Sequence, residues 1–190
     1  MNGAETNAVG KVLIDRAAIA RRVAELGREI TAAYRGEPLV ALSVLKGSFV
    51  FAADLLRAID TPLAVEFIGL RSYFGSRTQT SGVVEITQDV KYPLGGRHVL
   101  VIEDIVDTGL TLDYLMKNLA TRNPLSIKIA ALLHKPSRTI KPIPIDFLGF
   151  EIPDAFVVGY GLDFDGRYRN LPHIAVLEPD DAQLGLFPPR

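Results

Sequence analysis

Three acidic residues that follow one short apolar run are the side chains in this sequence best suited to chemistry. The run, Val99–Ile102, is β-branched and aliphatic, which is typical of a strand that a parallel sheet buries on both faces. Glu103 and Asp104 come directly after it, and Asp107 follows three residues later. Because ligands of open α/β sheets bind at the carboxyl ends of the strands, these acids predict a site for a metal ion and for sugar hydroxyls.

The loop from Asp107 to Thr111 suits a phosphate group. It offers backbone N–H groups, two threonine hydroxyls and the N-terminus of the next expected helix, all of which attract an anion. The alternative is an ordinary strand, turn and helix in which Asp107 or Thr108 is only the N-cap. The acid cluster favours the ligand-binding interpretation, because neighbouring carboxylates repel one another unless a cation or a donor joins them.

The elements that must position these residues alternate along the chain. Apolar residues at helical spacing predict a helix over Asp15–Ala33, with Asp15 as its N-cap. The alternation predicts an α/β fold, a doubly wound and mostly parallel sheet within one domain that spans residues 1–190. The other expected helices are Phe49–Ile59 and Leu110–Ala120, and the expected strands are Leu39–Leu45, Leu63–Leu70, Val83–Asp89, Val99–Glu103, Ser126–Leu133, Asp146–Phe150, Phe156–Val158 and Ile174–Val176.

Length and composition agree with one compact globular domain. It has 190 residues, of which 48% are hydrophobic and 23% charged, and this is enough to bury a full core. The net charge of −1 gives no electrostatic footprint for nucleic acid or for an anionic membrane surface. The sequence has no cysteine, which fits a reducing compartment, and no apolar stretch reaches the roughly 18 residues of a membrane span. We therefore expect a cytoplasmic protein with a flexible tail at residues 1–10 and no nucleic-acid or membrane partner.

One long polar stretch, Arg71–Gly82, separates two expected strands. It is either a solvated surface loop or an active-site lid with Gly75 and Gly82 as hinges, and composition alone leaves both possibilities open.

Several segments together resemble a known family. Residues 99–111 resemble the phosphoribosyl pyrophosphate (PRPP) binding motif of type I phosphoribosyltransferases, and the resemblance extends from about Val12 to Leu177. The other matching segments resemble the hypoxanthine-guanine branch of that family. They are Leu45–Ser48, resembling a first active-site loop with a non-proline cis peptide; Ser72-Tyr73, resembling a mobile active-site loop at 71–82; Lys135–Arg138; and Phe147–Asp154, Phe156–Asp163 and Arg167–Pro172, resembling a base-binding hood at residues 135–177.

The resemblance implies a role for each matching residue. Asp107 would accept a proton near N7 of the purine, and Leu110 departs from the mammalian pattern, which has a lysine there. The implied cofactor is Mg²⁺, two ions, with Mn²⁺ as a possible substitute. The implied ligand sets are Glu103, Asp104 and Asp163 for the metal, with Glu103 and Asp104 also on the ribose hydroxyls; Thr108, Gly109, Leu110 and Thr111 for the 5′-phosphate; Lys46, Gly47 and Arg169 for pyrophosphate; and Lys135, Phe156 and Val157 for the purine.

The implied reaction converts PRPP and an oxopurine into a nucleoside 5′-monophosphate and pyrophosphate, on a homodimer or homotetramer. Two alternatives remain. A PRPP-sensing regulator on the same fold would need a basic face or a DNA-binding extension, and neither is present in the sequence. A xanthine- or pyrimidine-specific relative would differ in the hood, and the sequence does not rank hypoxanthine, guanine and xanthine. The presence of Asp107, Lys135, Asp163 and Arg169 favours an enzyme.

Overall fold

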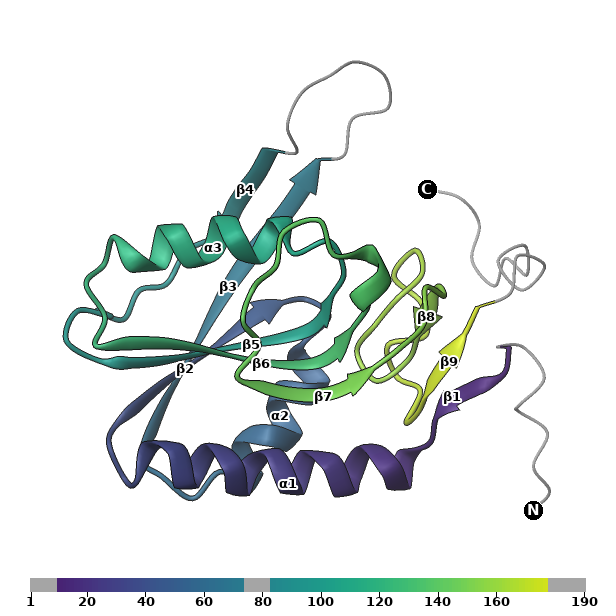
Figure 1. Ribbon diagram of the computed structural model, residues 1–190, viewed down its shortest axis with the longest axis horizontal. Coiled ribbons are helices and arrows are strands. Elements are labelled where there is room, and N and C mark those ends of the chain that lie inside the picture. Colours follow the sequence, from purple (N-terminus) through teal and green to yellow (C-terminus); the bar gives the residue numbers. More distant parts are fainter. Residues whose placement is uncertain (1–9, 74–82, 178–190) are drawn as a thin grey trace.

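The computed structural model describes residues 10–73 and 83–177 (Figure 1). Among the described residues, the first two helices each lie between strands, three strands in a row precede the third helix, and the elements after it are strands apart from one 3-10 turn. The helices α1, α2 and α3 agree with the predicted ones to within one residue at each end. The elements are β1 (Val12–Ile14), α1 (Arg16–Tyr34), β2 (Leu39–Leu45), α2 (Phe49–Ala58), β3 (Leu63–Tyr73), β4 (Val83–Gln88), β5 (His98–Val106), α3 (Leu110–Ala120), β6 (Ser126–His134), the 3-10 turn η1 (Pro136–Arg138), β7 (Phe147–Glu151), β8 (Val157–Val158) and β9 (Ile174–Val176).

The main sheet confirms the predicted fold class. Within the described ranges its six strands lie in the order β4-β3-β2-β5-β6-β7. Neighbouring strands from β3 to β7 pair in parallel, and the edge strand β4 pairs with β3 in the antiparallel direction. Parallel strands share the direction of their carboxyl ends, so β2, β5 and β6 deliver the residues that follow them to one edge of the sheet.

Helices cover both faces of this sheet (Figure 1). On one face α1 and α2 bury Leu26 and Leu55 against Leu100 of β5. On the other face α3 buries Leu115 in a second cluster that includes Val101 of the same strand. Because successive residues of β5 point into two different cores, the strand is held from both sides and forms a rigid support for the residues at its end.

A second, antiparallel sheet lies beyond the carboxyl ends of β5, β6 and β7 (Figure 1). Its order is β1-β9-β8, and β1 pairs with β9 through Val12 and Ala175. The strand β1 was not predicted, because it is set by pairing with β9, which lies far away in the sequence. It brings the N-terminal part of the chain to the hood, residues 135–177.

Two strands of the main sheet, β5 and β3, run three residues further than predicted. The strand β5 continues to Val106 and pairs with β6 up to that residue. Glu103 and Asp104 therefore lie within the strand and not after it. The strand β3 continues to Tyr73, and Ser72 and Tyr73 pair with β4 in the β3–β4 hairpin and do not lie in a loop. Pairing between strands is made by backbone groups, so a polar segment can also form a strand. The polar residues at the end of β3 were therefore predicted as a loop. The proposed hinges Gly75 and Gly82 lie outside the described residues. Among the described residues, none of the helices is both long and apolar enough to cross a membrane.

Candidate active site

The paired acids at the end of β5 lie in a setting that disfavours two negative charges. Burial raises the pKa of Glu103 well above its usual range, and the charge of Asp104 raises it further. Burial also raises the pKa of Asp104. The Oε2 atom of Glu103 is buried and has no hydrogen-bond partner. A buried carboxylate oxygen without a donor, beside a second carboxylate, is suited to a cation or to a ribose hydroxyl.

The phosphate-binding loop follows directly and leads into α3. Gly109, with φ of 80°, is the N-cap of α3, so the alternative in which Asp107 or Thr108 caps the helix is wrong. Both Ile140 and Lys141 donate their backbone N–H to the Thr108 carbonyl oxygen, at 3.1 and 2.9 Å, and so hold the loop from outside. A cavity of about 360 Å³ opens here, lined by Glu103, Asp107, Thr108, Gly109, Thr111 and Arg138 among others. The Leu110 side chain is exposed and contributes no charge to this cavity.

A third segment, Leu45–Ser48, approaches the acids from β2. The Leu45–Lys46 peptide bond is cis, as the family resemblance implies. Gly47 lies so close to β5 that an added Cβ atom would overlap the Asp104 carboxylate. Lys46 is exposed and lines a hollow together with Arg71 and Arg169. Glycine at position 47 therefore allows a cationic hollow to form within reach of the acids.

The hood closes this side of the site through Arg169. Its Nη2 atom pairs with Asp163 Oδ1 at 2.6 Å, and its Nη1 atom donates to the Gly161 carbonyl oxygen at 2.6 Å. The positive charge of Arg169 counteracts the raised pKa of Asp104. Asp163 is thus engaged by Arg169 and also accepts the Gly166 N–H at 2.7 Å. The described part of the chain contains no group of three or more His, Cys, Asp or Glu that could hold a metal ion.

The residues assigned to the purine lie on the other side of the same edge. Lys135 follows β6 and is buried, with 7% of its surface exposed, and its Nζ atom lies 3.9 Å from Asp154 Oδ1. Phe156 is 53% exposed and meets Phe164 edge to face, with the ring centroids 5.7 Å apart. Val157 is buried in β8. An exposed aromatic face near a buried cationic donor is suited to a flat heterocycle that carries an oxygen.

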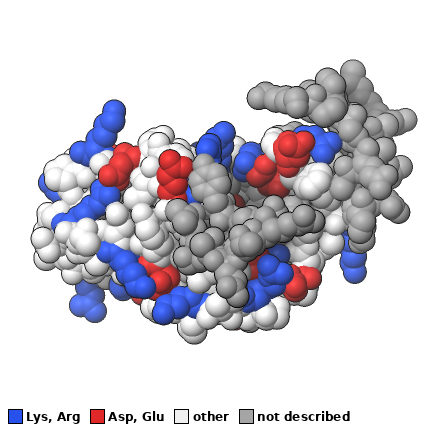
Figure 2. All heavy atoms as spheres, turned by 90° about the horizontal axis from the view of Figure 1, so that it is seen from above, with Lys and Arg blue, Asp and Glu red and all other residues white. Residues whose placement is uncertain are grey.

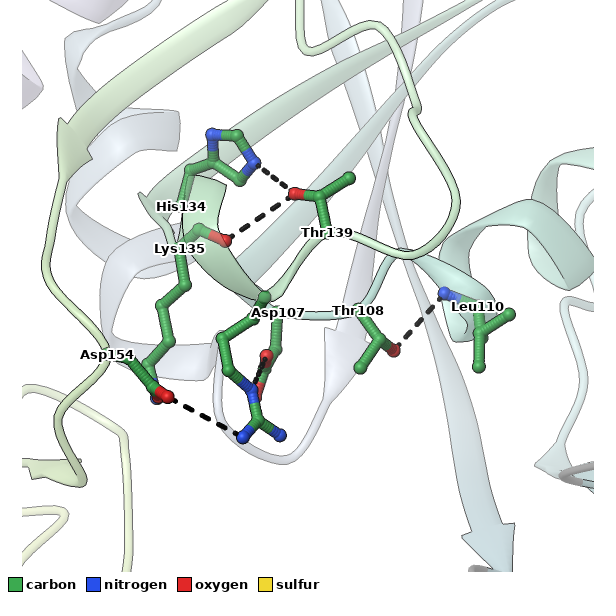
Figure 3. A network of polar contacts seen from close by, with 8 residues as sticks. Asp107, Thr108, Leu110, His134, Lys135, Thr139 and Asp154 are labelled. Carbon is green, nitrogen blue, oxygen red and sulfur yellow. Dashed lines mark hydrogen bonds and ion pairs between the residues drawn. The ribbon is translucent and has the colours of Figure 1, made fainter.

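Two residues of the site were not assigned from the sequence. Arg138 Nε donates to Asp107 Oδ1 at 2.9 Å, and Arg138 Nη1 lies 3.7 Å from Asp154 Oδ2 (Figure 3). The only sequence signal for Arg138 was its place three residues after Lys135, and Asp154 gave no signal of its own. Both are brought to the site by the folding of η1 and of the hood.

The structure therefore gathers at one sheet edge the predicted residues of β5, of the loop after it, of Leu45–Ser48 and of the hood. Ser72 and Tyr73 lie at the end of β3, and their role stays a prediction. Figure 2 shows basic and acidic side chains interspersed on the visible surface, in keeping with the net charge of −1.

Comparison with known proteins agrees with this geometry. Residues 12–165 match the family described as phosphoribosyl transferase domain. Over 171 residues the chain is 50% identical to a protein of Bacillus subtilis (strain 168) named hypoxanthine-guanine phosphoribosyltransferase, covering 90% of this chain and 94% of that protein. A protein of the same name from Mycobacterium avium is 47% identical over 177 residues, covering 90% of this chain and 87% of that protein.

The fold is also similar to solved structures. A crystal structure of a hypoxanthine phosphoribosyltransferase from Staphylococcus aureus superposes with a TM-score of 0.89 at 42% identity, covering 95% of this chain and 97% of that one. The family match spans most of the chain, and the relatives match it over nearly their whole length. This chain belongs to the phosphoribosyltransferase family.

Proposed function

We propose that this protein transfers the 5-phosphoribosyl group from PRPP to N9 of hypoxanthine or guanine, giving IMP or GMP and pyrophosphate. The observation that carries the proposal is one sheet edge at which an acid and the phosphate-binding loop line a cavity, while Asp107 of that loop is linked through Arg138 and Asp154 to the buried Lys135. The relatives named for this activity support the same substrates.

The sugar and its phosphate would be held by β5 and the loop after it. Residues Thr108–Thr111 bind the 5′-phosphate through N–H groups and hydroxyls at the start of α3, without a side-chain cation at Leu110. Glu103 and Asp104 accept hydrogen bonds from the ribose hydroxyls. As the bond from C1′ to pyrophosphate breaks, positive charge develops on the sugar, and the nearby carboxylates stabilise it electrostatically.

The departing pyrophosphate would be received by the cationic hollow. Lys46 and Arg169 both line it, and Arg169 is already oriented by Asp163 and by the Gly161 carbonyl. These two cations neutralise the charge that accumulates on the leaving group, and this lowers the barrier without transfer of a proton.

The residues at the end of β5 fit a role in holding Mg²⁺. The unpartnered buried Oε2 of Glu103 and its neighbour Asp104 are hard oxygen ligands, and Mg²⁺ is commonly bound by one or two carboxylates together with substrate phosphates. When bound, the ion would supply charge neutralisation to the pyrophosphate, and Mn²⁺ could replace it. Asp163, which pairs with Arg169, would contribute to holding a second ion.

The base would lie between Phe156 and the edge of β6. Phe156 stacks on the ring, the backbone of Val157 contacts its edge, and Asp107 accepts the proton at N7. Lys135 has only donors, so it satisfies a 6-oxo group and opposes the amino group of adenine. Closure of the site would exclude water, which otherwise hydrolyses PRPP.

The choice of base tests the proposal directly. An unpaired buried donor costs about 1–3 kcal/mol, so we expect kcat/KM for adenine to be at least roughly tenfold below that for hypoxanthine or guanine. Lys135→Ala should narrow this gap by reducing oxopurine use. The control is Lys117→Ala, which removes a lysine exposed on α3 and paired with Asp113. Comparable use of adenine and hypoxanthine by the unmodified protein would refute the assignment.

We also propose that the protein works as a homodimer or homotetramer in the cytoplasm. Phe49 of α2 and Val65 and Phe67 of β3 are large apolar side chains with 40% or more of their surface exposed, and such side chains favour self-association. Light scattering of the purified protein gives the number of subunits. A stable monomer at micromolar concentration would exclude both assemblies.

A further inference from the structure

Arg138 joins three separate parts of the site through one side chain. It lies on η1, directly after β6, and its guanidinium group reaches Asp107 in the loop after β5 and Asp154 in the hood (Figure 3). Asp154 in turn has its second oxygen 3.9 Å from Lys135 Nζ. The four side chains form one chain of ion pairs, Asp107–Arg138–Asp154–Lys135. Its two ends are the residues proposed to contact N7 and the 6-oxo group of the purine.

The two ion pairs of Arg138 are too exposed to contribute much to the stability of the fold. The side chains of Arg138, Asp107 and Asp154 are 47%, 39% and 53% exposed, and ion pairs this open to solvent contribute little to the free energy of folding. Their effect is geometric. Arg138 donates a hydrogen bond from Nε to Asp107 and attracts Asp154 to Nη1 at 3.7 Å, so the planar guanidinium orients the Asp107 carboxylate and keeps Asp154 beside it.

The arrangement leaves Asp107 available to a ligand. Arg138 Nε donates to Oδ1 of Asp107, and among the described residues no other hydrogen bond or ion pair of the Asp107 side chain is found. The hydrogen bond to Oδ1 orients the carboxylate and leaves Oδ2 available to a ligand. The cavity beside the phosphate-binding loop is lined by both Asp107 and Arg138.

We infer that Arg138 is a positioning residue for base transfer, which orients the Asp107 carboxylate for N7 and, through Asp154, keeps it in register with Lys135. The inference rests on the proposed function. Arg138 does not exchange a proton in this role and does not contact the reacting C1′ atom. Its removal should leave PRPP binding intact and misdirect the group that receives the purine proton.

The test is a double-mutant cycle with steady-state kinetics on hypoxanthine and PRPP. Arg138→Ala should lower kcat roughly tenfold and leave KM for PRPP within about twofold, because the lost interaction concerns the transfer step and not the binding of PRPP. In an Asp107→Asn background the same change should lower kcat by less than about twofold, since the group that Arg138 orients is already disabled. Arg138→Lys, which keeps the charge but not the fork, should recover part of the loss.

The matched control is Arg122→Ala. Arg122 pairs with Asp89 at 2.7 Å, beyond the end of α3 and away from the lining of the cavity. Its removal should leave kcat unchanged, and thermal unfolding of all variants reports whether each is folded. Equal tenfold losses in the wild-type and Asp107→Asn backgrounds, or wild-type kcat in Arg138→Ala, would overturn the inference. An unmodified protein that uses no oxopurine would instead refute the proposed function, and with it the inference.

Discussion

At the scale of single residues, the site is built from groups that are unfavourable in the absence of a ligand. Glu103 has a buried oxygen without a partner and shares its surroundings with Asp104, and burial raises the pKa of both. Such an arrangement reduces the stability of the free protein, and a bound cation or hydroxyl group relieves it. The burial of these two carboxyl groups thus lowers the stability of the free protein and favours the binding of a ligand.

Glu103→Gln should therefore stabilise the free protein at neutral pH. The pKa of Glu103 is raised in the folded state, so the folded protein holds this proton more tightly than the unfolded chain, and stability falls as pH rises from the unfolded pKa towards the folded one. Glutamine has no such loss. We expect the Tm of Glu103→Gln to equal that of the wild type near pH 4 and to exceed it by a few degrees near pH 7, on the order of 1 kcal/mol.

Thermal unfolding between pH 4 and pH 8 in metal-free buffer measures this difference. Glu37→Gln is the control, because Glu37 is exposed, and its Tm should follow the wild type at every pH. Transferase activity of Glu103→Gln should be strongly reduced even where its Tm is higher. A Tm below that of the wild type at pH 7 would contradict the argument.

At the scale of elements, the site depends on close backbone contact between the segment after β2 and the hood. Gly161 has φ of 104°, and an added Cβ atom would overlap the carbonyl oxygen of Gly47. The neighbouring Tyr160 donates its hydroxyl to Asp54 of α2 at 2.6 Å, which fixes the hood against that helix. These contacts hold Gly161 where its carbonyl accepts from Arg169.

Gly161→Ala should separate these two segments. Both a positive φ and the overlap with Gly47 oppose a side chain, whereas at Gly36, with φ of 84°, an added Cβ atom would meet nothing within 4 Å. Each alanine carries the roughly 1 kcal/mol cost of a left-handed backbone. We expect Gly161→Ala to lower kcat/KM at least roughly tenfold, through displacement of Lys46 and Arg169, and Gly36→Ala to leave it unchanged. Kinetics and Tm of both variants check this, and equal effects on activity would contradict it.

The same scale shows what the sequence could predict. The strand β2 and the helix α3 match their predicted bounds, because β2 is buried on both faces and α3 begins after a glycine. The extension of β3 and the strand β1 were missed, since both are set by pairing partners that lie elsewhere in the chain. The roles of Lys46, Lys135 and Arg169 came from family resemblance and not from periodicity, and the Arg138–Asp154 contact follows only from the tertiary fold.

At the scale of the whole molecule, the residues proposed for the two substrates come from two different parts of the fold. The main sheet supplies the acids and the phosphate-binding loop, and the hood supplies Phe156 and Lys135. Glu103 and Asp104 are the carboxylates proposed for a divalent cation, and Mg²⁺ is commonly bound by one or two carboxylates together with substrate phosphates.

Removal of metal should accordingly affect activity and not the fold. Excess chelator should abolish transfer, and added Mg²⁺ or Mn²⁺ should restore it. The Tm of the protein without PRPP should stay the same with and without chelator, while PRPP should raise the Tm far more with Mg²⁺ present than absent. Activity assays and thermal unfolding in the four combinations of PRPP and Mg²⁺ measure this, and full activity in excess chelator would exclude a metal requirement.

The pairing of β1 with β9 has a consequence for the order in which the protein can be made. Among the described elements β1 comes first along the chain and β9 comes last. The main sheet, with its acids and phosphate-binding loop, is complete once β7 has been synthesised, but β1 has no partner until β9 emerges. A chain shortened before β9 would therefore leave both β1 and β8 without a partner strand, because β9 is the middle strand of their sheet.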